Sequence, residues 1–336
     1  MAARPDVTTL YKWPEAWGLP SLSPACIQAE AYLRLAGADF CVEVCSTASS
    51  SPTGQLPCLE RGSFLLPADS DEFASSTALI AYAKKHIRDL DAPLSLGQRA
   101  DLLAFSTLVE TRLNAATTIS CWGESRGFSE YKKAAYGNRL PFPLSHLIPW
   151  SRQREVLRRL GPAHEDPDKV YQGAIQVLDA LADRLRSSGS AFFFGAAASS
   201  LDALLAGHLL FYRSSSAAAP VLADKVQSQP VLCEYLDRLL GRHFALPAPA
   251  RSAVEGAAPS WSEAARGQKK APPPKVEPSA AELTFRRHSM YWMAGAGAAI
   301  VAYLLMSGRY IKFVPMLEQA LEGDDDEGDE EDDGDE

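Results

Sequence analysis

The chain has 336 residues, of which 46% are hydrophobic, and a formal net charge of −9. Twelve acidic residues and no basic ones lie in Glu322–Glu336, so the rest holds 33 basic against 30 acidic residues and is nearly neutral. This balance excludes a strongly basic nucleic-acid-binding body. Six cysteines form no CxxC pair and no histidine cluster has zinc-ligand spacing, so we expect reduced thiols and no metal site.

Residues 1–92 alternate between strand and helix signals. β-branched and aromatic residues indicate the strands, and Ser23-Pro24 can open the first helix because proline is tolerated at its first position. The elements expected in order are a strand at Val7–Trp13, a helix at Ala25–Leu35, a strand at Phe40–Val44, a strand introduced by Leu56–Leu59, its hairpin partner at Ser63–Leu66, and a helix at Ser75–Ile87.

Residues 93–245 show helical periodicity only. A proline-rich interruption begins at Leu140 and continues to Pro149. Leu201–Tyr212 is almost wholly apolar, which predicts a central buried helix. The other expected helices are Gln98–Asn114, Lys169–Arg186 and Gln229–Gly241.

Residues 246–336 predict a linker, one membrane span and an acidic tail. Residues 246–288 contain seven prolines and no apolar period, and residues 309–336 end in the acidic run, which should be disordered. Residues 289–308 carry no charge and, as a helix, reach about 30 Å, the thickness of a bilayer core. The layout is that of a tail-anchored protein, since the first residues lack the apolar run of a secretory signal and hold Pro5 and Asp6, which suit a mitochondrial presequence poorly.

Within the expected span, the aromatic rings of Tyr291, Trp292 and Tyr303 lie toward its two ends, and small residues form one face. The anchoring residues are Tyr291, Trp292, Ala294, Ala298, Ala302, Leu304 and Leu305. The alanines recur every four residues and would let a partner helix approach closely, although an Ala/Gly-rich anchor without a partner explains them equally well.

The order β-α-β, then β-β-α, followed by helices, is the layout of the glutathione-transferase fold. Leu56-Pro57 stands where thioredoxin-like folds place a cis-proline. Ser199 and Asp202 form a capping-box pattern at the start of the apolar helix. We therefore expect an α+β, glutathione-transferase-like fold: a thioredoxin-like N-terminal domain (1–92), an all-helical C-terminal domain (93–245), and a C-terminal transmembrane helix (289–308).

The chain more closely resembles the metaxin family, and the plant metaxins most. The motifs that carry the resemblance are Trp17–Ser21, Gly54–Pro57, Leu140–Leu144, Phe192–Gly195 and Ser199–Ala203, followed by the span and the acidic end. The resemblance implies a non-catalytic receptor or scaffold subunit for protein import and β-barrel assembly in the mitochondrial outer membrane. Its implied partners are the β-barrel assembly core, other outer-membrane import subunits, β-barrel precursors and membrane lipid, with no cofactor and no nucleic acid. The body would face the cytosol and the tail the intermembrane space.

The alternative is a membrane-anchored glutathione transferase. Such an enzyme needs a thiolate-stabilising side chain near the first helix, for which Ser21, Ser23 and Cys26 are candidates, although each is also an ordinary loop or cap residue. It also needs an acidic residue followed by Ser or Thr at the start of the last helix of the first domain. That acidic position holds Ser76, before Thr77, while Asp71 and Glu72 come too early. Without the carboxylate a substrate ammonium would be unpaired, so we expect no enzyme activity.

The remaining polar and aromatic candidates favour structural roles. His208 fits a satisfied core histidine better than a metal ligand, and Phe192–Phe194 fits the core. The cluster Arg152, Arg154, Arg158 and Arg159 could bind an acidic partner or phospholipid, but a solvated helix face is favoured. Lys269, Lys270 and Lys275 suit anionic lipid or plain solubility equally.

Overall fold

The computed structural model describes residues 7–68, 76–140, 144–161 and 166–244. The chain divides into two compact units, residues 1–268 and 269–336, and every described residue belongs to the first. The expected linker, span and acidic tail lie outside the described residues. Among the helices that are described, none combines the length and apolarity needed to cross a bilayer.

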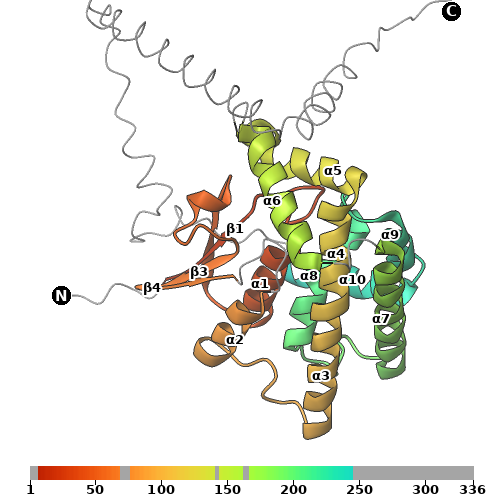
Figure 1. Ribbon diagram of the computed structural model, residues 1–336. Coiled ribbons are helices and arrows are strands. Elements are labelled where there is room, and N and C mark those ends of the chain that lie inside the picture. The colour runs from red at the N-terminus through yellow and green to blue at the C-terminus, as the bar shows by residue number, and fades with distance from the viewer. Residues whose placement is uncertain (1–6, 69–75, 141–143, 162–165, 245–336) are drawn as a thin grey trace, which may run out of the picture. The chain divides into compact units, whose positions relative to one another are not determined.

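A four-stranded sheet with two helices forms the N-terminal part (Figure 1). Its strand order is β2-β1-β3-β4; β1 and β2 are parallel, while β1–β3 and β3–β4 are antiparallel. The expected order of strands and helices is confirmed, with ends shifted by one or two residues. The elements are β1 (Thr8–Lys12), α1 (Pro24–Leu35), β2 (Phe40–Val44), a 3-10 turn η1 (Ala48–Ser50), β3 (Cys58–Arg61), β4 (Phe64–Pro67) and α2 (Thr77–His86).

Helices alone form the remainder of the described chain (Figure 1). The first is capped by Ser95, which exchanges hydrogen bonds with Gln98, and it runs without a break through two π-helical turns to Gly123. The elements are α3 (Leu96–Leu108), η2 (Val109–Leu113), α4 (Asn114–Thr118), η3 (Ile119–Gly123), α5 (Ser125–Tyr136), a 3-10 turn η4 (Gly137–Arg139), α6 (Leu144–Leu160), α7 (Pro167–Ser188), α8 (Ser200–Ser214), α9 (Pro220–Gln227) and α10 (Pro230–His243).

Helix α8 is the buried centre of the body, as the apolar run Leu201–Tyr212 predicted. Every residue from Ser200 to Tyr212 is buried, and α8 packs chiefly against α1. Gly207 permits this approach, since a Cβ there would lie 2.5 Å from both Gln28 Cγ and the Pro24 carbonyl oxygen. The sheet part and the helical part therefore share one hydrophobic core.

The predicted interruption up to Pro149 is wrong, because Pro149 lies inside α6. Proline removes one helical hydrogen bond, but Pro149 is buried, so its ring contributes to packing. Helices α5 and α9 were not predicted either. Their apolar residues are sparse: Gly127, Tyr131, Ala135 and Tyr136 are the buried positions of α5, and Leu222 and Val226 those of α9.

Candidate functional site

The turn between β1 and α1 is the position where a transferase would hold the glutathione thiol. Its candidates Ser21, Ser23 and Cys26 are all fully buried. Ser21 Oγ donates to the Trp13 carbonyl oxygen (2.9 Å) and accepts from the Ser23 N–H (3.4 Å). Burial raises the pKa of the Cys26 thiol to about 11, so it stays protonated at neutral pH. These side chains stabilise the turn and cannot reach a ligand in solvent.

The start of α2 is the position where a transferase would bind the γ-glutamyl group of glutathione. The side chain of Gln28 hydrogen-bonds to the protein there. Gln28 Oε1 accepts from both the backbone N–H and the hydroxyl of Ser76, each at 3.1 Å. The Gln28 amide nitrogen donates to the Leu204 carbonyl oxygen of α8 (3.2 Å). Thr77 Oγ1 donates to Glu110 (2.6 Å). The groups at Ser76 and Thr77 that would bind a γ-glutamyl group thus form hydrogen bonds within the protein instead. Asp71 and Glu72 lie outside the described residues.

Two features that the sequence analysis singled out, Pro57 and the Ser199–Asp202 pair, are local structure rather than chemistry. The Leu56–Pro57 peptide bond is cis and precedes β3. Asp202 is fully buried, and its carboxylate accepts from the Ser199 N–H (2.8 Å), the Ser199 hydroxyl (2.7 Å), the Phe193 N–H (3.3 Å) and Tyr235 Oη (2.9 Å). Burial raises the pKa of Asp202, while these donors oppose the shift.

His208 lies in the core of α8 and has a hydrogen-bond partner there. Its Nδ1 is 3.0 Å from Thr117 Oγ1, which is 2.8 Å from Tyr212 Oη. Burial lowers the pKa of His208 to about 3, so the ring is neutral in the folded protein. Throughout the described part of the chain, no group of three His, Cys, Asp or Glu side chains could hold a metal ion.

Acid should therefore destabilise the protein through His208. Below its ordinary pKa of about 6.5 the unfolded chain binds a proton that the folded chain does not, so stability is full above pH 6.5 and falls as the pH is lowered toward 3. Between pH 7 and pH 5 this single group should remove about 2 kcal/mol from the free energy of unfolding. Urea unfolding at several pH values measures it. His208→Asn should flatten the slope, and a slope unchanged by this substitution would contradict the assignment to His208.

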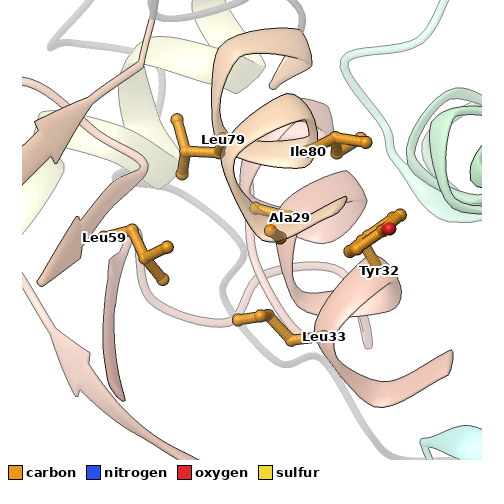
Figure 2. Close-up of a pocket in the computed structure, with 7 residues that line it drawn as sticks. Ala29, Tyr32, Leu33, Leu59, Leu79 and Ile80 are labelled. Carbon is orange, nitrogen blue, oxygen red and sulfur yellow. The ribbon is translucent and has the colours of Figure 1, made fainter. Parts of the chain in front are cut away.

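Two cavities among the described residues have no cysteine, histidine or acidic side chain in their walls. The one in Figure 2 is enclosed by α1, α2 and β3, with Leu59, Leu79, Ile80, Ala29, Tyr32 and Leu33 around it. It measures about 10 Å³, room for no more than about one water molecule. A groove of about 440 Å³ between α3 and α7 is shallow and lined by Arg112, Lys169 and apolar or amide side chains.

A cavity of about 320 Å³ lies between α1, β2 and α10, with a buried charge cluster on its wall. Lys12 Nζ is 2.6 Å from Glu30 Oε2, and Arg34 donates to Glu30 Oε1 from Nε (2.9 Å) and Nη2 (2.7 Å). Arg34 also donates to the His243 carbonyl oxygen (2.8 Å) and lies over the Phe244 ring. No spacing or motif in the sequence pointed to this cluster, which joins β1, α1 and the end of α10. Its cations are engaged with Glu30, so it reads as a structural ion pair rather than an anion site.

Comparison with known proteins agrees with the resemblance seen in the sequence. The model of the Tom37 family, described as an outer mitochondrial membrane transport complex protein, matches residues 26–153, and that of the glutathione S-transferase C-terminal domain matches residues 174–239. Metaxin-1 of Bos taurus is 28% identical over 312 residues, 89% of this chain and 90% of the relative. The Arabidopsis thaliana mitochondrial outer membrane import complex protein METAXIN is 26% identical over 90% of this chain and 93% of its own. The chain is therefore similar to metaxins over about nine-tenths of its length.

Solved glutathione transferases also align with this chain. Glutathione S-transferase III in its apo form is 17% identical and covers 80% of this chain and 100% of its own, with a TM-score of 0.43. Glutathione transferase GSTFuA3 from Phanerochaete chrysosporium is 15% identical over 70% of this chain and 96% of its own, with a TM-score of 0.47. The fold assignment itself rests on the sheet order, the helical part and the matched C-terminal domain model.

Proposed function

We propose that the protein is a non-catalytic receptor or scaffold subunit for importing proteins into mitochondria and assembling β-barrel proteins in the outer membrane. The observation that carries the proposal is the match to metaxins over about nine-tenths of the chain, one of which is named as an outer-membrane import complex protein. The Tom37 match over residues 26–153 supports the same role. Its partners would be the β-barrel assembly core, other import subunits and β-barrel precursors.

The body works by binding rather than by chemistry. A glutathione transferase must expose a side chain that stabilises the thiolate, whereas Ser21, Ser23 and Cys26 are each fully buried. Gln28 occupies the start of α2 from within the protein. The purified chain should therefore not conjugate glutathione to a generic aromatic electrophile under conditions where a known transferase does. Turnover above the uncatalysed rate would restore the enzyme alternative.

The proposed location is the mitochondrial outer membrane, with the body in the cytosol and the acidic Glu322–Glu336 end in the intermembrane space. Residues 289–308 supply the span, on the hydropathy of the sequence. Protease added to intact mitochondria should then digest the body but spare an epitope placed after residue 336. Loss of the epitope without rupture of the outer membrane would contradict this topology.

Affinity purification from mitochondria in mild detergent tests the role and the small-residue face together. We expect a β-barrel assembly core among the captured partners, and its absence would contradict the import role. Ala298→Leu should reduce capture of a partner that contacts the span, because leucine prevents close approach of a second helix. Resistance to alkaline extraction checks that the variant is still inserted. Unchanged capture would remove the small-residue interface while leaving the import role intact.

A further inference from the structure

Helix α6 attaches to the body by one face and leaves the other outside. Gln153 Nε2 donates to the Trp122 carbonyl oxygen (2.8 Å), Pro149 is buried, and Val156 and Leu160 pack against the core. These four positions share one helical face because they recur at spacings of three and four. The opposite face therefore points away from the body.

The first half of this outward face is apolar. Leu144, Leu147 and Ile148 are 44%, 45% and 37% exposed, which places three large aliphatic side chains within little more than one helical turn. Single exposed leucines are ordinary, but a contiguous apolar patch on a helix marks a surface that binds something.

The second half of the outward face is basic. Arg154 and Arg158 are exposed at spacings that continue the face of Leu147. Trp150 stands between the two halves, with the Arg154 guanidinium 4.8 Å from its ring centroid. Within α6, Arg152 and Arg159 pair with Glu155. Arg154 and Arg158 are therefore the exposed charges that continue the face of the exposed aliphatic side chains.

We propose that the outward face of α6 docks the body onto an anionic lipid surface. Aliphatic side chains beside a tryptophan and a row of arginines are what a helix lying in a membrane interface presents. The side chains of Leu144, Leu147 and Ile148 would insert at the boundary of the acyl chains. Arg154 and Arg158 would form hydrogen-bonded ion pairs with lipid phosphates. The chain's own acidic end, Glu322–Glu336, is opposite in charge to the arginines. It contains only Asp, Glu and Gly, so it has no apolar side chain to pack against Leu144, Leu147 and Ile148. A membrane provides acyl chains for the apolar half of the face and phosphates for the basic half, whereas an acidic peptide binds the basic half alone.

A fluorescent reporter on the full-length chain tests the docking. An environment-sensitive dye is placed on Leu147→Cys in a Cys233→Ser background, because the other five cysteines are buried. The matched control carries the dye on Leu103→Cys, because Leu103 is 71% exposed and belongs to α3. Figure 1 shows α3 at the end of the body opposite α5. Each protein is reconstituted into vesicles of phosphatidylcholine alone and of phosphatidylcholine with phosphatidylserine.

We expect a blue shift at position 147 in the phosphatidylserine vesicles and none at position 103. Arg154→Gln with Arg158→Gln should lower the ratio of docked to undocked protein by roughly 30-fold, about fivefold for each charge removed. Equal emission at position 147 in the two lipids would overturn the proposal, as would a shift that disappears when residues 322–336 are removed. The readout is independent of co-purified partners, so this inference and the import role can fail separately.

Discussion

Gly207→Ala should destabilise the protein by about 3 kcal/mol or prevent it from folding. The added methyl would stand 2.5 Å from both Gln28 Cγ and the Pro24 carbonyl oxygen, whereas unstrained carbon contacts lie near 3.5–4.0 Å. Gln28 can move only by giving up its hydrogen bonds to Ser76 and Leu204. The backbone oxygen can move only if α1 separates from α8, which opens the centre of the core. Overpacking of this kind typically costs 1–3 kcal/mol or more.

Gly241→Ala provides the matched control. Gly241 is also helical, in α10, and a Cβ there would meet nothing within 4 Å. Alanine should therefore stabilise that helix by about 0.5 kcal/mol, since glycine is the poorer helix former. Urea unfolding followed by circular dichroism measures both changes. Gly207→Ala with the midpoint of the wild type would mean that α1 and α8 are not in the close contact described.

Local sequence signals predicted much of the sheet part. Phe40–Val44 was predicted at its observed ends because aromatic or β-branched residues stand at alternate positions, Phe40, Val42 and Val44. Helix α1 was predicted from its proline-led start. The first part of helix α6 was not predicted, because the prolines up to Pro149 indicated an interruption, whereas a helix face was expected at Arg152–Arg159. A single lost hydrogen bond does not decide a helix whose inward face packs against the core. Local pattern therefore failed where tertiary packing supplied the stability.

The polar groups of the site region were harder to predict, because their partners are distant in sequence. Ser199–Asp202 could be seen because three residues separate the pair. Gln28 is buried against Ser76 and Leu204, 48 and 176 residues away, and Asp91 accepts from Ser200 across 109 residues. No period or spacing marks such pairs. The missing carboxylate at Ser76 could be read from the sequence, but only the structure shows that Gln28 takes its place.

Asp202→Ala should cost about 3 kcal/mol of the free energy of unfolding. The substitution leaves four donors, the N–H groups of Ser199 and Phe193 and the hydroxyls of Ser199 and Tyr235, without the carboxylate they share inside the core. A buried donor without a partner costs about 1–3 kcal/mol, and partial relaxation keeps the total below the sum of four such losses. The loss also removes the cap of the helix on which the whole core is assembled.

Asp237→Ala separates this effect from the mere loss of an aspartate. Asp237 pairs with Arg213 at 2.7 Å, but its side chain is 61% exposed, so the pair contributes no more than about 1 kcal/mol. Asp202→Asn distinguishes charge from geometry, because the amide keeps one acceptor oxygen and turns the other position into a donor that faces the Ser199 or Tyr235 donors. We therefore expect denaturation midpoints in the order Asp237→Ala, then Asp202→Asn, then Asp202→Ala, from highest to lowest. A midpoint for Asp202→Ala equal to that of Asp237→Ala would mean that the buried donors find other acceptors, and that the start of α8 is held by packing alone.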